Sequence, residues 1–187
     1  MIEIRWHGRG GQGAVTAVEM LALAAIEEGK YAQGFPSFGP ERRGAPVMAF
    51  NRIGDKPLKV RAGIYKPDVV VILDPSLLKL EPVTNGLKSD GILIVNTTKP
   101  AEEIRKILNY KGTLYTVDAA HIAKEELGVN ITNTTMLGAV LQATGVLKFE
   151  SLEPPIEHRF GKLAGKNMAA LKRAARELKL AEMAKAA

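Results

Sequence analysis

Cysteine is absent from this chain of 187 residues. Without thiols the chain cannot form a disulfide, bind zinc through thiolates, hold an iron–sulfur cluster with ligands of its own or use a cysteine nucleophile. Any redox centre of that kind would therefore have to lie on a partner chain.

Long apolar runs are also missing. No stretch reaches the roughly twenty apolar residues that a transmembrane helix needs. The first residues, Met1 to Arg5, lack the order of charged and then apolar residues that is typical of a signal peptide. We expect a soluble cytoplasmic protein that contacts no membrane.

Aromatic residues are scarce, at 5% of the chain, although the formal net charge is +6. A nucleic-acid-binding surface usually combines aromatic platforms with a basic stripe, whereas here Lys and Arg are spread out and concentrate in the last third, between Ala and Leu. We expect no nucleic acid as a partner. The positive charge instead suits an anionic cofactor or an acidic partner protein.

The hydrophobic and charged contents, 46% and 25%, are those of a globular protein with a substantial core. No internal repeat, linker or low-complexity boundary interrupts the chain. We therefore predict one domain over residues 1–187.

Short apolar segments rich in β-branched residues alternate with helical patterns along most of the chain. This order predicts an α/β, Rossmann-like fold with a mainly parallel sheet and crossover helices. The predicted strands are Ile2 to Trp6, Val69 to Leu73, Ile92 to Val95 and Leu114 to Val117. The predicted helices are Ala14 to Ile26, Pro100 to Leu108, Ala119 to Leu127, Thr134 to Ala143 and a long C-terminal helix at about Ala164 to Ala184.

A different pattern lies between the first helix and the second predicted strand. After a short strand near Tyr31, the segment Gly34 to Pro46 has three Pro and three Gly, which predicts a long loop. Val47 to Ile53 then alternates as a strand does, Gly54 begins a turn, and Leu58 to Arg61 returns. These residues predict an antiparallel hairpin.

The turn between the first strand and the first helix has the pattern G-x-G-x-x-G. Its residues are Gly8, Arg9, Gly10, Gly11, Gln12 and Gly13. Such a turn can bring backbone amides and a helix N-terminus close to an anion. A dinucleotide site also needs an acidic residue about twenty positions later, and the segment from Tyr31 to Gly34 has none. A different anionic ligand, a protein contact, or close packing of helix on strand without a ligand remain open, and Arg9 favours an anion.

The loop from Phe35 to Pro46 combines rigid residues and two aromatics with Glu41, Arg42 and Arg43. Adjacent guanidinium groups can bind phosphates or carboxylates in a fork geometry, and Glu41 could orient one of them. The alternative is a structural loop whose arginines pair with local acids or carbonyls.

Other polar residues have ordinary interpretations. His7, His121 and His158 share no metal-ligand spacing, and only His7 lies beside the glycine-rich turn. Asp74 and Asp118 each end a predicted strand, where an aspartate can contact a ligand but more often caps the next helix. The cap interpretation also applies to the residues at the start of the fourth predicted helix, which are Asn133, Thr134 and Thr135.

Three motifs follow one another along the chain: the segment Gly8 to Gly13, the segment Ser37 to Gly44 and the segment Asn133 to Ala139. Each is weak alone. Together, in this order and in a chain of this length, they resemble the gamma subunits of pyruvate or 2-ketoisovalerate:ferredoxin oxidoreductases, within the 2-oxoacid:ferredoxin oxidoreductases. The resemblance covers most of the chain.

This resemblance implies a hetero-oligomer with alpha, beta and ferredoxin-like delta subunits, in which the partner chains bind thiamine diphosphate with magnesium and carry the iron–sulfur clusters. The implied reaction converts a 2-oxoacid, coenzyme A and oxidised external ferredoxin into acyl-CoA, carbon dioxide and reduced ferredoxin. The gamma chain holds none of these cofactors alone and has no thiamine diphosphate motif. We expect the isolated chain to be inactive and to contain no catalytic or metal-binding residue.

Our leading hypothesis is that the chain helps to bind coenzyme A, with the segment Gly8 to Gly13 and Arg42 or Arg43 facing its phosphates, and closes one side of the active-site cleft. One alternative is a purely structural subunit whose arginine loop docks partner chains. Another is a free-standing nucleotide-binding oxidoreductase. Pyruvate and branched-chain 2-oxoacids differ by a few carbon atoms, and nothing in this chain selects between them.

Overall fold

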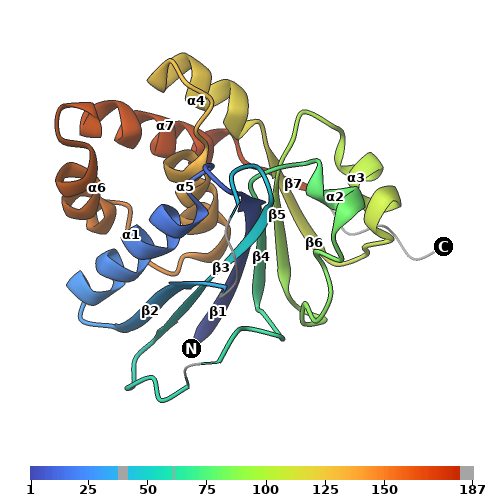
Figure 1. Cartoon of the computed structure of the whole chain (residues 1–187), viewed down its shortest axis with the longest axis horizontal. Helices are drawn as coiled ribbons and strands as arrows, with labels where there is room; N and C mark the ends of the chain where they lie inside the picture. Colours follow the sequence, from blue (N-terminus) through green and yellow to red (C-terminus); the bar gives the residue numbers. More distant parts are fainter. Residues whose placement is uncertain (38–41, 61, 182–187) are drawn as a thin grey trace.

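The computed structural model describes residues 1–37, 42–60 and 62–181. Its centre is a seven-stranded sheet with the order β2-β3-β1-β4-β5-β6-β7 (Figure 1). The strands are β1 (Ile2–Arg9), β2 (Tyr31–Pro36), β3 (Pro46–Gly54), β4 (Val69–Ile72), β5 (Ile92–Asn96), β6 (Thr113–Val117) and β7 (Lys179–Ala181). Strands β1, β4, β5 and β6 are parallel, which confirms the predicted α/β class with a mainly parallel sheet.

Helices cover the two faces of the sheet unequally (Figure 1). The helices are α1 (Ala14–Glu27), α2 (Leu77–Leu80), α3 (Ala101–Leu108), α4 (Ala119–Leu127), α5 (Asn133–Thr144), α6 (Glu153–Phe160) and α7 (Ala164–Glu177), and 3-10 turns at Glu150–Leu152 and Gly161–Leu163 flank α6. The larger apolar core lies under α1, α4, α5, α6 and α7. A smaller core on the other face lies between α2, α3 and strands β4 to β6.

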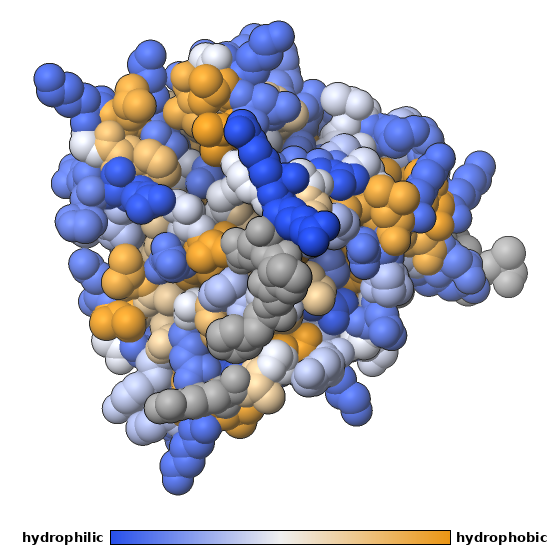
Figure 2. All heavy atoms as spheres, in the orientation of Figure 1, coloured by the Kyte–Doolittle hydropathy of each residue, from blue (hydrophilic) through white to orange (hydrophobic). Residues whose placement is uncertain are grey.

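Strands β4 and β5 are hydrophobic along almost their whole length because side chains on both of their faces are buried. Alternate residues of β4 belong to different cores: Val69 and Val71 to the larger one, Val70 and Ile72 to the smaller one. A continuous run of β-branched residues is typical of a parallel strand covered on both faces. The surface in Figure 2 is by contrast largely hydrophilic, with hydrophobic side chains in separate patches. No helix of the described residues is long and apolar enough to cross a membrane.

The predicted hairpin between Val47 to Ile53 and Leu58 to Arg61 is not formed. Strand β3 pairs antiparallel with β1 on one side and with β2 on the other, so residues 58–60 have no free edge of β3 to join. They are not a strand, and residue 61 lies outside the described residues. The antiparallel hairpin of this region is β2–β3.

Two other predicted boundaries were wrong. The segment Gly34 to Pro46 is regular at both ends, since β2 continues to Pro36 and β3 begins at Pro46, where a proline at a strand end costs no ladder hydrogen bond. The C-terminal helix ends at Glu177, and β7 then pairs antiparallel with β6. Pairing with the open edge of β6 outweighs the helix propensity of this Ala- and Lys-rich segment.

Candidate functional site

The glycine-rich turn joins the carboxyl end of β1 to the start of α1. Strand β1 is longer than predicted, because Gly8 and Arg9 still pair with β3, so the turn itself spans residues 10–13. Gly13 is the N-cap of α1 with φ 80°, and no side chain caps the helix. The first-turn amides of α1 are therefore available to an anion.

Close packing explains part of the glycine pattern. A β-carbon at Gly10 would lie 2.4 Å from the carbonyl oxygen of Arg42, and one at Gly13 would lie 2.5 Å from Nδ2 of Asn133. The backbone of Gly10 also donates to the oxygen of Ala45 at 2.9 Å and accepts from the amide of Gly44 at 3.0 Å. The turn and the arginine segment, predicted separately as site elements, are thus in direct contact.

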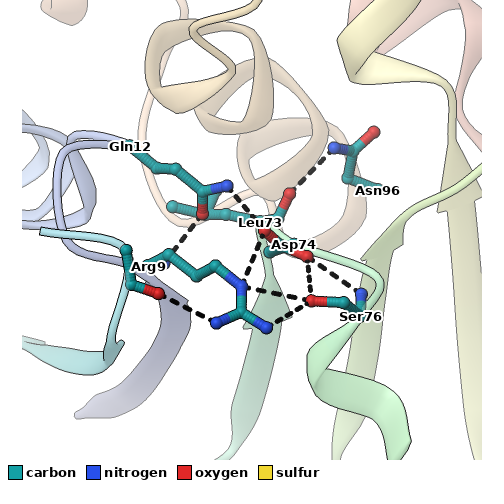
Figure 3. A network of polar contacts seen from close by, with 7 residues as sticks. Arg9, Gln12, Leu73, Asp74, Ser76 and Asn96 are labelled. Carbon is teal, nitrogen blue, oxygen red and sulfur yellow. Dashed lines mark hydrogen bonds and ion pairs between the residues drawn. The ribbon is translucent and has the colours of Figure 1, made fainter.

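Arg9 belongs to a polar network at the end of β4 (Figure 3). Its guanidinium donates to Oγ of Ser76 and to the carbonyl oxygen of Gly44, and its Nε lies 3.3 Å from a carboxylate oxygen of Asp74. Gln12 links both ends of this network, because its Oε1 accepts from the Arg9 amide at 2.8 Å and its Nε2 donates to Asp74 at 2.7 Å. The positive charge of Arg9 is therefore partly neutralised within the chain.

The carboxylate of Asp74 is the centre of this network. Burial alone would raise its pKa, but hydrogen bonds from Ser76 and Gln12, together with the charge of Arg9, outweigh burial and lower the pKa. Asp74 is therefore ionised at neutral pH. Ser76 was not predicted from the sequence, and only its position two residues after Asp74, where a serine commonly forms a turn with an aspartate, could have indicated it.

Arg42 and Arg43 differ from Arg9. Both side chains are exposed, and neither forms a hydrogen bond or ion pair with any of the described residues. The predicted orienting residue Glu41 lies outside the described residues. Arg43 also forms a backbone bridge with Gly10, so two free positive charges lie on a segment that is attached to the turn.

A crevice of about 360 Å³ opens at the carboxyl ends of β4, β5 and β6. Asn96, which sequence reasoning missed, is buried there and links Leu73 to Ala120 through its side-chain amide. Asp118 accepts from the amide of His121 at 3.0 Å, which confirms its predicted role as a helix cap. The crevice is polar and lies beside Asp74, at the position where open α/β sheets bind ligands.

The start of α5 is tied to other helices and not only to its own first turn. The helix begins at Asn133, so the N-cap is Thr132 and not one of the three predicted residues, and Thr132 forms no side-chain cap hydrogen bond. The Oδ1 of Asn133 accepts from the amide of Thr134. The hydroxyl of Thr134 also donates to Asn167 of α7 at 2.6 Å. The Asn133 side chain packs on Gly13, so the motif Asn133 to Ala139 contacts the glycine-rich turn.

The connection that follows α1 is not that of a standard dinucleotide fold. There, the second strand would lie parallel and next to β1, and its end would carry the acid for the ribose. Here α1 leads to β2, which is an edge strand antiparallel to β3 and not adjacent to β1. This topology agrees with the missing ribose acid.

Comparisons with known proteins agree with the motifs. A model of the family described as pyruvate ferredoxin/flavodoxin oxidoreductase matches residues 3–177. The chain is 59% identical over 176 residues to the pyruvate/ketoisovalerate oxidoreductases common subunit gamma of Thermococcus kodakarensis, covering 93% of this chain and 95% of that protein. The crystal structure of pyruvate oxidoreductase subunit PORC from Thermotoga maritima matches with a TM-score of 0.88 and 46% identity, covering 97% of this chain and 98% of that one.

A more distant structure shows the same fold inside a longer chain. In 2-oxoglutarate:ferredoxin oxidoreductase from Magnetococcus marinus the match has a TM-score of 0.76 and 19% identity, and it covers 94% of this chain but 30% of that one. That structure was determined with 2-oxoglutarate, coenzyme A and succinyl-CoA bound. At this identity the likeness concerns the fold alone.

Proposed function

Because the chain belongs to the pyruvate ferredoxin/flavodoxin oxidoreductase family, as a gamma subunit of a 2-oxoacid:ferredoxin oxidoreductase, we propose that its own task is to help bind coenzyme A. The phosphates of coenzyme A would contact Arg42, Arg43 and the turn at Gly10 to Gly13. In this position the subunit would also close one side of the active-site cleft of the complex.

The observation that carries this proposal is the pair of unpaired arginines on a segment attached to an uncapped helix N-terminus. Arginine presents its donors in a planar fork that matches phosphate oxygens, and helix amides add further donors. Arg9 contributes less to this charge, because Asp74 neutralises part of it. Its proposed role is to hold the turn in register with Gly44 and Ser76.

The partner chains would supply the chemistry. We propose alpha, beta and delta subunits that carry thiamine diphosphate, magnesium and iron–sulfur clusters, an external ferredoxin as electron acceptor, and a cytoplasmic location. Choice between pyruvate and branched-chain 2-oxoacids would also lie on the partners. The relative from Thermococcus kodakarensis is described as common to pyruvate and ketoisovalerate oxidoreductases, which supports this division of labour.

The test replaces both arginines, as Arg42→Ala with Arg43→Ala, in the reconstituted complex. Each lost charge-assisted hydrogen bond costs about 1.5 kcal/mol or more, so the KM for coenzyme A should rise by about tenfold to a hundredfold while the KM for the 2-oxoacid stays unchanged. The matched control, Lys162→Ala with Lys166→Ala, removes two exposed positive charges near the start of α7 and should change neither constant.

Two results would contradict this function. An unchanged KM for coenzyme A in a normally assembled complex would remove the arginines from the binding site. Loss of assembly in size-exclusion chromatography, without a change in KM for the remaining intact complex, would instead favour the structural role in which the arginine segment docks partner chains.

A further inference from the structure

A second cavity, of about 520 Å³, lies on the face of the sheet opposite α1. Its floor is formed by β1, β3 and β2. The register brings Arg5 opposite Phe50, His7 opposite Met48 and Phe35 opposite Phe50, so all of these side chains lie on one face. Helices α2 and α3 pack over β4 to β6, whereas residues 63–65 and 81–85 border the cavity over β1, β3 and β2.

The polar floor of the cavity is a buried pair, Arg5 and His7. The Nε of Arg5 donates to Nε2 of His7 at 3.0 Å, and Nη2 of Arg5 donates to the carbonyl oxygens of Val83 and Asn85 at 3.0 and 2.7 Å. Arg5 is 7% and His7 5% exposed. Both side chains are therefore held in place by the fold.

This pair determines the tautomer of His7. Arginine can only donate, so Nε2 of His7 must accept, and the proton of the neutral ring is on Nδ1. Burial, and next the charge of Arg5, lower the pKa of His7 to about 3, so the ring stays neutral at physiological pH. The Nδ1–H has no acceptor among the described residues, although His7 lines the cavity. A donor without a partner among the described residues thus belongs to a residue that lines this space.

The walls are largely aromatic and apolar. The rings of Phe35 and Phe50 lie 5.4 Å apart, Met48 is 38% exposed, and Tyr65, at 79% exposed, stands at the mouth. Glu81 also lines the cavity, and it is an acidic residue whose side chain can accept a hydrogen bond. A volume of this size is typical of sites for small ligands, which are mostly apolar with a few placed polar groups.

We propose that this cavity binds the adenine ring of an adenine nucleotide, whose phosphates reach Arg42 and Arg43; the phosphate half of this inference rests on the function proposed above. A purine is flat and can stack on an aromatic wall of the cavity. Its ring nitrogens can accept a hydrogen bond from His7, and its amino group can donate one to Glu81. His7 precedes Gly10 by three residues, or about 10 Å along β1. A ribose and its first phosphate can span this distance.

The nucleotide can come from two sources. One is the adenosine end of coenzyme A, and the other is a free adenine nucleotide that regulates the complex. Both present the same ring to the cavity, so the first experiment uses a probe that they share, and the second separates them.

The first experiment is a calorimetric titration of the purified complex with adenosine 3′,5′-bisphosphate, and with pantetheine as the part of coenzyme A that lacks adenine. Met48→Trp fills the cavity from a partly exposed position and should weaken binding of the bisphosphate by about tenfold or more, with pantetheine binding unchanged. The control Leu23→Trp adds the same side chain to α1, at a position 51% exposed on the other face, and should change neither.

A milder variant tests the cavity in case Met48→Trp misfolds. Tyr65→Ala removes a mostly exposed side chain and should weaken the bisphosphate by about threefold through lost stacking. Unchanged affinity in both variants, or no binding to the unaltered complex, would overturn the proposal. Dissociation of the complex by Met48→Trp with unchanged nucleotide binding would also overturn it and would assign the cavity to a partner chain.

The second experiment measures the KM for coenzyme A in the Met48→Trp complex. A rise parallel to the loss of bisphosphate binding identifies coenzyme A as the source. An unchanged KM, together with weakened bisphosphate binding, identifies a free nucleotide as the source. The proposal that the cavity binds adenine is then retained, even if the arginine variants show that the proposed coenzyme A contact is wrong. Conversely, a KM that responds to the arginines but not to Met48→Trp, with bisphosphate binding intact, retains the proposed function and rejects the cavity.

Discussion

The two halves of the sheet differ in the side chains that they bury. In the half formed by β4 and β5, side chains on both faces are apolar and buried by helices. In the half formed by β1, β3 and β2, one face packs on α1, but the other carries Arg5, His7 and Arg52, all less than a tenth exposed. Loop carbonyl oxygens accept from Arg5 and Arg52, and a cavity remains beside His7. The first half buries apolar side chains on both faces, and the second contains the cavity for which we propose a ligand.

The largest expected effect concerns the helical layer over the apolar half. A β-carbon at Gly138 of α5 would lie 1.9 Å from the carbonyl oxygen of Leu171 of α7, so Gly138→Ala must push the two helices apart. We expect a loss of about 3 kcal/mol or more in the free energy of unfolding, measured by urea denaturation. Gly165→Ala is the control, because nothing lies within 4 Å of that site in α7, and it should stabilise by about 0.5 kcal/mol.

The second effect concerns the polar half, where a hydrogen-bonded amide joins the sheet to α1. The Oδ1 of Asn51 accepts from the indole of Trp6 at 3.0 Å, and its Nδ2 donates to the carbonyl oxygen of Val18 at 2.8 Å. Asn51→Leu has a similar volume but leaves both partners unsatisfied, so the free energy of unfolding should fall by about 3 kcal/mol. The exposed Asn130→Leu should change it little, and equal losses would contradict the role of the network.

The same contrast explains what the sequence could predict. Strand β4 and helix α4 were placed within one residue, because burial on both faces makes a strand uniformly apolar and an Asp cap with a terminal Gly bounds a helix. The pairing of β3 with β1 and β2 was missed, since a strand that carries Asn51 and Arg52 shows no signal for its partners. Local sequence patterns do not show which strands pair with each other.

Long-range contacts also limited prediction of the candidate site. The glycine-rich turn and the arginine segment were both recognised, but their contact through Gly10 joins residues more than thirty positions apart. The bond between Gln12 and Asp74 spans 62 positions, and the ion pair between Arg9 and the same Asp74 changes the expected role of Arg9. The Arg5–His7 pair was not predicted, although alternation along β1 places these two side chains on the same face.

The third effect is a pH dependence specific to the polar half. His7 binds a proton at its ordinary pKa of 6.5 in the unfolded chain but only at about 3 in the fold. The unfolded state therefore binds more protons between these values. The contribution of His7 to the free energy of unfolding is fully present above pH 6.5 and is lost as the pH falls toward 3. The loss should reach about 2 kcal/mol at pH 5.

Denaturation curves at pH 7.5 and pH 5 measure this loss. His7→Gln keeps an acceptor for Arg5 but does not titrate, so its stability should fall about 2 kcal/mol less between the two pH values. The exposed His158→Gln should retain the full dependence of the unaltered chain. Parallel curves for the unaltered chain and His7→Gln would show that burial and the charge of Arg5 do not keep His7 neutral.

The smallest effect returns to the parallel half and separates capping from ligand binding at its carboxyl end. Asp118 caps α4 and also lines the polar crevice beside Asp74. Asp118→Ala should cost about 1 kcal/mol in the free energy of unfolding, whereas Asp118→Asn should cost little, because asparagine caps a helix as well as aspartate does. Neither should change the KM for coenzyme A if the proposed arginine contacts bind its phosphates. A stable Asp118→Asn complex with an altered KM would instead move the binding site from the arginine segment to this crevice, where the negative charge itself would then be required.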